Sequence, residues 1–158
     1  MKEGEVKMWT AVDLYSYAQT FRESYSVVMK PLSDELGMTQ TAVDILMFLA
    51  NNPGKDTSTD IRAFLRLKPG IVSFHVDRLV NEGYLERGIV SSDRRKFHLI
   101  CTQKAIPFIT KGRKLQEEFQ RRMFEGFGDG DIGRFAGALN AIEKNMNRIL
   151  EEAKETLI

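Results

Sequence analysis

Cysteine and histidine are scarce in this chain of 158 residues, which contains one cysteine and two histidines. A single cysteine excludes an internal disulfide framework. Because Cys101, His75 and His98 lack the CxxC or HxxxH spacing of a metal site, we expect no metal and no cofactor. Cys101 shares the inward phase of a strand-like run with Phe97 and Leu99. We therefore expect a buried, unreactive thiol rather than a redox sensor.

Long hydrophobic runs are also missing. No apolar stretch approaches the roughly 18–20 residues that are needed to span a bilayer. The first residues, MKEGEVKMW, are polar and of mixed charge, without the apolar core of a signal peptide. These features predict a cytoplasmic protein that does not enter a membrane.

Catalytic motifs are absent as well. The sequence contains no GxSxG, no Walker loop, no HExxH, and no GxGxxG after a strand. Gly126, Gly128 and Gly130 are spaced like a weak glycine motif, but they follow a helical segment and are interpreted as a turn. No set of histidine, cysteine and carboxylate residues converges, so we do not expect an enzyme.

A net positive charge is found only in the middle third, although the net charge of the whole chain is +1. Residues 54–104 contain ten basic and six acidic side chains, a net of +4. The preceding residues carry a net of −3, from four basic and seven acidic side chains, and residues 105–158 are balanced at nine of each. The middle third is therefore the expected face for an anionic partner, and chance scatter is the alternative.

Apolar residues at spacings of three and four predict a mainly helical chain. In the first helix Pro31 predicts a kink or break near Lys30. Gly37 is expected to end that helix and Thr39 to begin the next. Thr102 is expected to cap a long helix that a glycine-rich turn ends, and Asp129 or Asp131 to open the last one. The expected helices are 10–36, 39–51, a short one within 56–67, 69–82, 102–126 and one from about 129 to the C-terminus, with strands in YLERGIV and KFHLICT.

The order of short helix, turn, helix and β-hairpin predicts a helix-turn-helix with an adjoining hairpin. Such a motif presents its second helix, here 69–82, to the major groove of DNA. Val72, Val76 and Leu79 form the buried stripe of this helix. The residues of its start and outer face are the predicted DNA contacts: Lys68, Gly70, Ser73, Phe74, Asp77 and Arg78.

The tip of the hairpin carries a cluster of charges, Asp93, Arg94, Arg95 and Lys96. A hairpin beside a major-groove helix reaches the adjacent minor groove, where the negative potential favours arginine. Asp93 has the wrong charge for a phosphate contact, so we expect it to orient one guanidinium in a bidentate pair. The alternative is a solvated tip that only protects the edge of the sheet.

Three segments together resemble the multiple antibiotic resistance regulator (MarR) family of winged-helix transcription factors. They are LGMTQTAVDILMFLA, SFHVDRLVNEGYLER and SSDRRKFHLICT. The resemblance covers about residues 10–125. Its motifs are Asp77-Arg78-Leu79, Gly83-Tyr84-Leu85-Glu86-Arg87, Asp93-Arg94-Arg95, Leu99 and Thr102.

Four places depart from the usual pattern of the family. Cys101 stands where an aliphatic residue is usual, and Ala105 where glycine is usual. The start of the recognition helix is Lys68-Pro69 instead of a small polar residue. His75 takes a position often held by leucine, and it is a further candidate for contacting DNA.

The resemblance also implies a pocket between the dimerisation helices and the winged helix, often for an aromatic or phenolic effector. The first helix is rich in aromatic residues; core and dimer packing is the expected role for most of them, and the pocket is the alternative for some. The candidate pocket residues are Tyr15, Tyr17, Phe21 and Tyr25.

The last helix carries a heptad-like apolar seam, which predicts a homodimer. Its residues are Ile132, Phe135, Leu139, Ile142, Met146 and Ile149. A two-fold dimer places two recognition helices about 34 Å apart, a spacing that suits a pseudo-palindromic operator in double-stranded DNA.

The fold class we expect is mainly α with a small antiparallel β-hairpin: a winged helix-turn-helix plus a helical dimerisation domain. We expect residues 1–36 and 102–158 to dimerise and residues 37–101 to bind DNA. The expected function is a sequence-specific, ligand-responsive homodimeric repressor. A ligand-independent regulator and a winged-helix interaction module that does not bind DNA are the alternatives.

Overall fold

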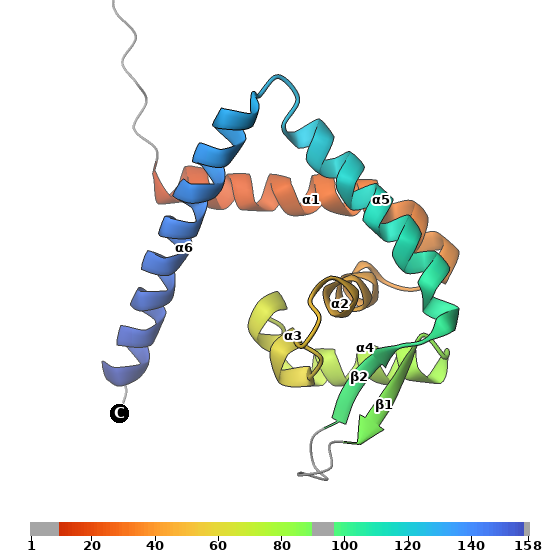
Figure 1. Ribbon diagram of the computed structural model, residues 1–158. Coiled ribbons are helices and arrows are strands. Elements are labelled where there is room, and N and C mark those ends of the chain that lie inside the picture. The colour runs from red at the N-terminus through yellow and green to blue at the C-terminus, as the bar shows by residue number, and fades with distance from the viewer. Residues whose placement is uncertain (1–9, 90–96, 157–158) are drawn as a thin grey trace, which may run out of the picture. The chain divides into compact units, whose positions relative to one another are not determined.

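The computed structural model describes residues 10–89 and 97–156 (Figure 1). The described residues form helices and one two-stranded antiparallel sheet, which confirms the expected fold class. The chain divides into two units, Met1–Phe119 and Gln120–Ile158. In chain order the elements are α1 (Ala11–Leu36), α2 (Gln40–Asn51), α3 (Ser58–Leu65), α4 (Pro69–Asn81), β1 (Leu85–Ile89), β2 (Phe97–Cys101), the 3₁₀ helix η1 (Gln103–Ala105), α5 (Ile106–Met123) and α6 (Asp129–Thr156).

Local sequence signals set most of the helix ends. Thr10 caps α1 through a capping box with Asp13, in which each side chain satisfies a backbone N–H of the other residue. Gly37 ends α1 in the left-handed conformation, with φ of 60°, and the Thr39 hydroxyl accepts a hydrogen bond from the backbone of Ala42. Both of these predicted caps are confirmed.

Two predicted boundaries are wrong. Helix α1 has no break near Lys30 and continues through Pro31 to Leu36, whereas the alternative of a kink there stays a prediction. The buried side chains of Leu32 and Leu36 anchor this last part of the helix, and their packing offsets the backbone hydrogen bond that proline removes. Thr102 does not cap a long helix: its hydroxyl donates to the carbonyl of Gly83 at 2.6 Å, and a 3₁₀ turn precedes α5.

The core of the first unit is built around α2, which is buried over most of its length. Helix α5 approaches this core at Gly112. A Cβ atom added there would overlap the end of the Met47 side chain and lie 3.0 Å from Cδ2 of Leu32, so a larger residue would require Met47 to shift. The largest fully buried side chains are Met29, Leu32, Ile45, Leu46, Met47, Ile61, Leu79, Leu85, Val43 and Val72.

Strands β1 and β2 pair in register, with Arg87 opposite Leu99 and Ile89 opposite Phe97. Leu99 is buried, but Phe97 is 45% exposed, so the expected inward phase of Phe97 is wrong. Phe97 is the first residue of β2, on the side of the hairpin tip, where no core side chain covers it. Cys101, at the other end, is partly buried, and burial raises the pKa of its thiol, as expected for an unreactive cysteine.

The second unit consists of the end of α5, a turn and the 28-residue helix α6. Phe124 packs edge-on against Phe127 and Phe135 at the start of this unit. No helix in residues 10–89 and 97–156 is both long and apolar enough to cross a membrane.

Candidate nucleic-acid interface and ligand cavity

The buried stripe of α4 determines which of its residues face solvent. Val72, Val76 and Leu79 are between 0% and 3% exposed, which confirms the predicted buried stripe. The opposite face presents Ser73 and Phe74, and Phe74 is 62% exposed. Neither side chain is covered by another element of the described residues. The outer face is therefore open to a partner.

The first turn of α4 also leaves one backbone donor, the N–H of Gly70, because Pro69 has no N–H and the N–H groups of Ile71 and Val72 donate to the Lys68 carbonyl. Lys68 is the N-cap residue and makes no side-chain cap hydrogen bond, because an ammonium group has no acceptor. Pro69 and Gly70 follow it, and all three residues are exposed. An uncapped helix start with an adjacent cation suits a negatively charged group such as a phosphate.

His75 points into the core instead of toward solvent. It is 7% exposed, so its assignment as a DNA contact is wrong. Its Nδ1 atom has no hydrogen-bond partner among the described residues. Burial, and then the charge of Arg78, lower the pKa of the imidazole. Successive residues of a helix are rotated by 100°, so residue 75 lies at the edge of the stripe formed by Val72, Val76 and Leu79 and is buried with it.

Two predicted DNA-contacting side chains, Asp77 and Arg78, make contacts within the chain. Nη2 of Arg78 donates to the carbonyl of Gly37 at 2.7 Å, which ties α4 to the end of α1. Asp77 forms an ion pair with Arg87 of β1. The pair is partly exposed and contributes little to stability, but it connects α4 to the hairpin.

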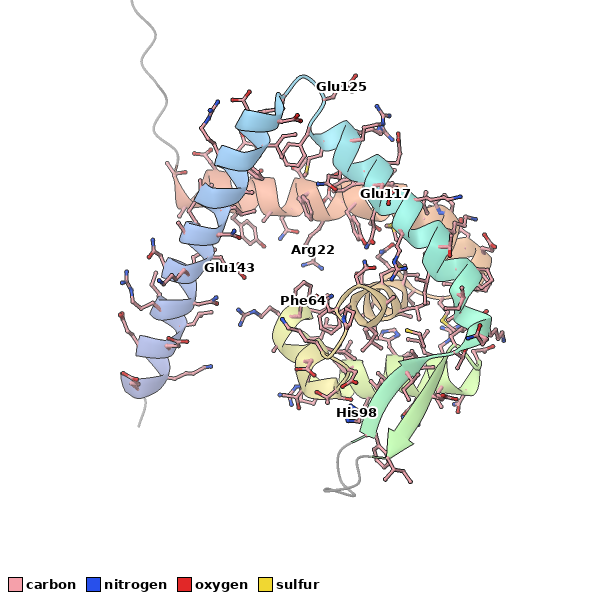
Figure 2. All side chains as sticks on the ribbon, in the orientation of Figure 1. Arg22, Phe64, His98, Glu117, Glu125 and Glu143 are labelled. Atoms are coloured by element: carbon pink, nitrogen blue, oxygen red, sulfur yellow. The ribbon has the colours of Figure 1, made fainter. Side chains whose placement is uncertain are left out.

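The hairpin is held from its other side by Asp56, which lies between α2 and α3. The backbone N–H of Leu99 donates to the Asp56 carbonyl at 2.8 Å, and Nδ1 of His98 lies 2.6 Å from Oδ1 of Asp56 (Figure 2 labels His98). Sequence patterns did not indicate this contact, which joins residues 42 positions apart. The predicted tip residues Asp93, Arg94, Arg95 and Lys96 lie outside the described residues, so their roles remain predictions.

A cavity of about 300 Å³ lies within the first unit, between helices α1, α2, α3 and α5. Its walls combine apolar and polar side chains. They are Tyr25 from α1, Asp44, Met47, Phe48 and Asn51 from α2, Asn52 just after it, Phe64 and Leu65 from α3, and Gln116 from α5. A larger hollow along α6 is lined by side chains of that helix alone and is open surface.

Hydrogen bonds order the polar side of the cavity. Gln116 donates to the Tyr25 hydroxyl at 2.8 Å and accepts from the Asn51 amide at 2.8 Å. Gln40 donates to Oδ1 of Asp44 at 2.8 Å. Burial is the main cause that raises the pKa of the Asp44 carboxyl and the pKa of the Tyr25 hydroxyl above their ordinary values. The polar side of the cavity is therefore partly screened from water and retains groups that can recognise a ligand.

The four aromatic residues assigned to a pocket separate in the structure. Tyr25 lines the cavity, and Phe21 stacks parallel to it at a centroid distance of 6.3 Å. Both rings meet Phe119 of α5 edge-on at 5.3 Å. Tyr15 and Tyr17, nearer the start of α1, are exposed and are not among the lining residues.

Sequence reasoning missed most of the cavity, including Asp44, Asn51 and Gln116. One signal was present: Asp44 is an isolated charge inside the apolar run AVDILMFLA. A charged residue in such a run requires a local reason, because burying an unpaired carboxylate is costly. Asn51 and Gln116 carried no signal, since polar residues are common both at a helix end, where Asn51 lies, and within a mainly polar helix, where Gln116 lies.

The apolar seam of α6 is exposed in the single chain. Five of its residues, Phe135, Leu139, Ile142, Met146 and Ile149, are between 45% and 63% exposed, and Ile132 is half-buried. Among residues 10–89 and 97–156, no group of three or more His, Cys, Asp or Glu could hold a metal ion.

Comparison with known proteins identifies the fold. A family model described as MarR family matches residues 36–96. No curated protein sequence matches the chain. Among solved structures, a MarR transcriptional regulator from Methanosarcina mazei Go1 is 18% identical, with a TM-score of 0.74, and the match covers 86% of this chain and 97% of that one.

Two further structures have the same fold. A MarR protein from Peptoclostridium difficile is 17% identical with a TM-score of 0.74, over 92% of this chain and 94% of that one. CouR from Rhodococcus jostii RHA1, whose structure was determined bound to p-coumaroyl-CoA, is 19% identical with a TM-score of 0.66, over 82% and 87%. The resemblance seen in the sequence motifs is thus confirmed: the chain has the MarR fold, and its residues 36–96 match the MarR family.

Proposed function

We propose that this protein is a sequence-specific DNA-binding transcriptional regulator, which acts as a homodimeric repressor and releases DNA when a small molecule binds. The observation that carries the proposal is the solvent-facing side of α4, where Ser73 and Phe74 are exposed and Lys68 stands at an uncapped helix start. The contacts of Arg78 with Gly37 and of Asp77 with Arg87 hold this face in a defined orientation.

Each exposed residue of α4 suits a different part of a DNA site. The Phe74 ring is apolar and matches the methyl group of thymine, the one apolar feature of the major groove. Ser73 both donates and accepts, and so discriminates less between bases. Lys68 and the backbone N–H of Gly70 suit a phosphate, which positions the helix without reading sequence.

The seam of α6 supports the dimeric state. A row of large apolar side chains at three- and four-residue spacing is costly to leave in water, and a second copy of the seam is the partner that its heptad pattern fits. In this proposal residues 1–36 and 102–158 form the dimerisation domain and residues 37–101 bind DNA. A two-fold dimer then reads a pseudo-palindromic operator.

The cavity supports the response to a ligand. Its walls come from α1 and α5, which belong to the proposed dimerisation domain, and from α2 and α3, which belong to the proposed DNA-binding domain. A ligand that fits one relative position of these helices better than another shifts the population toward that position. The complex of the similarly folded CouR with p-coumaroyl-CoA is consistent with this role.

The test selects DNA without knowledge of the operator. Purified full-length protein is incubated with random duplexes, and bound DNA is recovered over several rounds and sequenced. We expect a two-fold symmetric consensus, and an affinity for it that falls steeply with salt. If no sequence is enriched and no binding appears at low salt, the protein is an interaction module instead. If DNA binds but no cavity ligand alters its affinity, the protein is a ligand-independent regulator.

A further inference from the structure

Asp44 is the one acidic residue among the described residues that line the cavity, and no basic residue is among them. The other lining groups are aromatic, aliphatic, phenol or amide side chains. A ligand inside this cavity therefore meets one negative charge and several neutral hydrogen-bonding groups. A cavity for an aromatic carboxylate would place a cation here instead.

The charge of Asp44 is only partly compensated by its neighbours. Gln40 donates one neutral hydrogen bond to Oδ1. Arg22 of α1 lies close enough for its charge to lower the pKa of Asp44, but its effect is smaller than that of burial. Figure 2 shows Arg22 extending from α1 toward the side that carries α2 and Phe64, and no ion pair between Arg22 and Asp44 is formed among the described residues. Oδ2 of Asp44 is thus available to a donor from a ligand.

The apolar walls favour a flat ring. Phe48 and Phe64 pack together with ring centroids 4.7 Å apart, and both line the cavity beside Met47 and Leu65. The volume of about 300 Å³ is at the lower end of the range for small-molecule sites, so it suits one or two fused rings. Aromatic faces also attract cations, which adds to the preference set by Asp44.

We propose that the cavity binds a small aromatic molecule carrying a protonated amine, and that Asp44 receives the ammonium group and disfavours aromatic carboxylates. This inference rests on the proposed role of the cavity as the effector site. An ammonium group in the cavity would pair with the partly buried carboxylate, whereas a carboxylate ligand would place two like charges together in a space that is partly screened from water. The Tyr25 hydroxyl and the Asn51–Gln116 pair lie on the same polar side and can complete the hydrogen bonding.

Three probes with one ring system separate charge from shape: tryptamine, the neutral alcohol tryptophol, and indole-3-propionate. Each carries an indole ring and a two-carbon chain, and they differ in the terminal group. Isothermal titration calorimetry on the full-length protein at neutral pH should give tryptamine an affinity at least tenfold higher than that of indole-3-propionate, with tryptophol in between.

The variant Asp44→Asn keeps the shape of the side chain and an oxygen for Gln40, but removes the charge. It should reduce the preference for tryptamine over indole-3-propionate to less than threefold. A circular dichroism spectrum and a urea midpoint equal to those of the native protein show that the variant is folded. Asp34→Asn is the matched control, because Asp34 is an exposed carboxylate of α1 that pairs with Lys30 and does not line the cavity. It should retain the full preference.

Three results would overturn the proposal: binding of none of the probes, equal or tighter binding of indole-3-propionate, or an unchanged preference in Asp44→Asn. The proposed function is tested separately, by the enrichment of DNA by the ligand-free protein. If DNA binds specifically and the probes fail, the ligand class is wrong and the regulator is not. If the probes bind as expected and no DNA is enriched, the ligand class is right and the proposed DNA-binding function is wrong.

Discussion

Gly112 offers the sharpest test of how the two halves of the first unit are packed, through the substitution Gly112→Ala. In a helix interior, alanine is ordinarily favoured over glycine by roughly 0.5–1 kcal/mol. Here the added Cβ would overlap the Met47 side chain and press on Leu32 at 3.0 Å. Overpacking of a dense core typically costs about 1–3 kcal/mol, so the unfolding free energy should fall by about 1 kcal/mol and by no more than about 2.5.

The matched control is Gly137→Ala. Gly137 lies inside α6, on the face opposite the apolar seam, and an added Cβ there meets no atom within 4 Å. The control should therefore show the ordinary gain of roughly 0.5–1 kcal/mol. Urea denaturation followed by circular dichroism at one protein concentration measures both variants, since the stability of a dimer depends on concentration.

A double-mutant cycle assigns the cause to Met47. Met47→Ala alone should cost about 2–5 kcal/mol through the space it leaves. In that background Gly112→Ala should no longer destabilise and should become neutral or favourable, a coupling of about 1–3 kcal/mol. If Gly112→Ala stabilises the native protein as Gly137→Ala does, the close approach of α5 to Met47 is refuted. Because Met47 also lines the cavity, a displaced Met47 would narrow it.

Four further predictions concern DNA binding, assembly and pH. Phe74→Ala should weaken binding to the selected operator by about 1–3 kcal/mol and alter the preferred base at one position of each half-site, which repeated selection would detect. Arg94→Ala should weaken DNA binding across many sequences and reduce the slope of log affinity against log salt by about one unit. Asp93→Ala should also weaken DNA binding, and tighter binding by this variant would reject the proposed pair of Asp93 with an arginine. Leu139→Glu should yield monomer or aggregate in sedimentation equilibrium, because a buried unpaired carboxylate is costly, and an unaltered dimer of about twice 18.1 kDa would exclude the seam from the interface. Burial lowers the pKa of His75 in the folded state below its ordinary value of about 6.5, so the unfolding free energy should be highest above that pH and decline as the pH falls toward the lowered pKa. His75→Leu should reduce this decline in urea titrations at several pH values. An identical pH dependence in the variant would contradict the burial of a neutral His75.

The sequence alone was sufficient for the local elements and the order of the motifs. The caps at Gly37 and Thr39 depend on the backbone within a few residues, and so their residue types predict them. The buried stripe of α4 follows from the spacing of Val72, Val76 and Leu79 for the same reason. The fold class followed from these signals together, because short helix, turn, helix and hairpin have few ways to pack.

Tertiary structure decided what each polar side chain does. Arg78 had the position of a DNA contact on its helix, but the carbonyl that it binds belongs to Gly37, 41 residues away. His75 had the same ambiguity, which the core settled by burying it. The cavity is formed by residues from Tyr25 to Gln116, which lie far apart in the sequence and which no periodicity relates. Helical spacing specifies a face within one element, whereas a side chain's partner depends on which other elements pack against that face, and only the folded chain determines this.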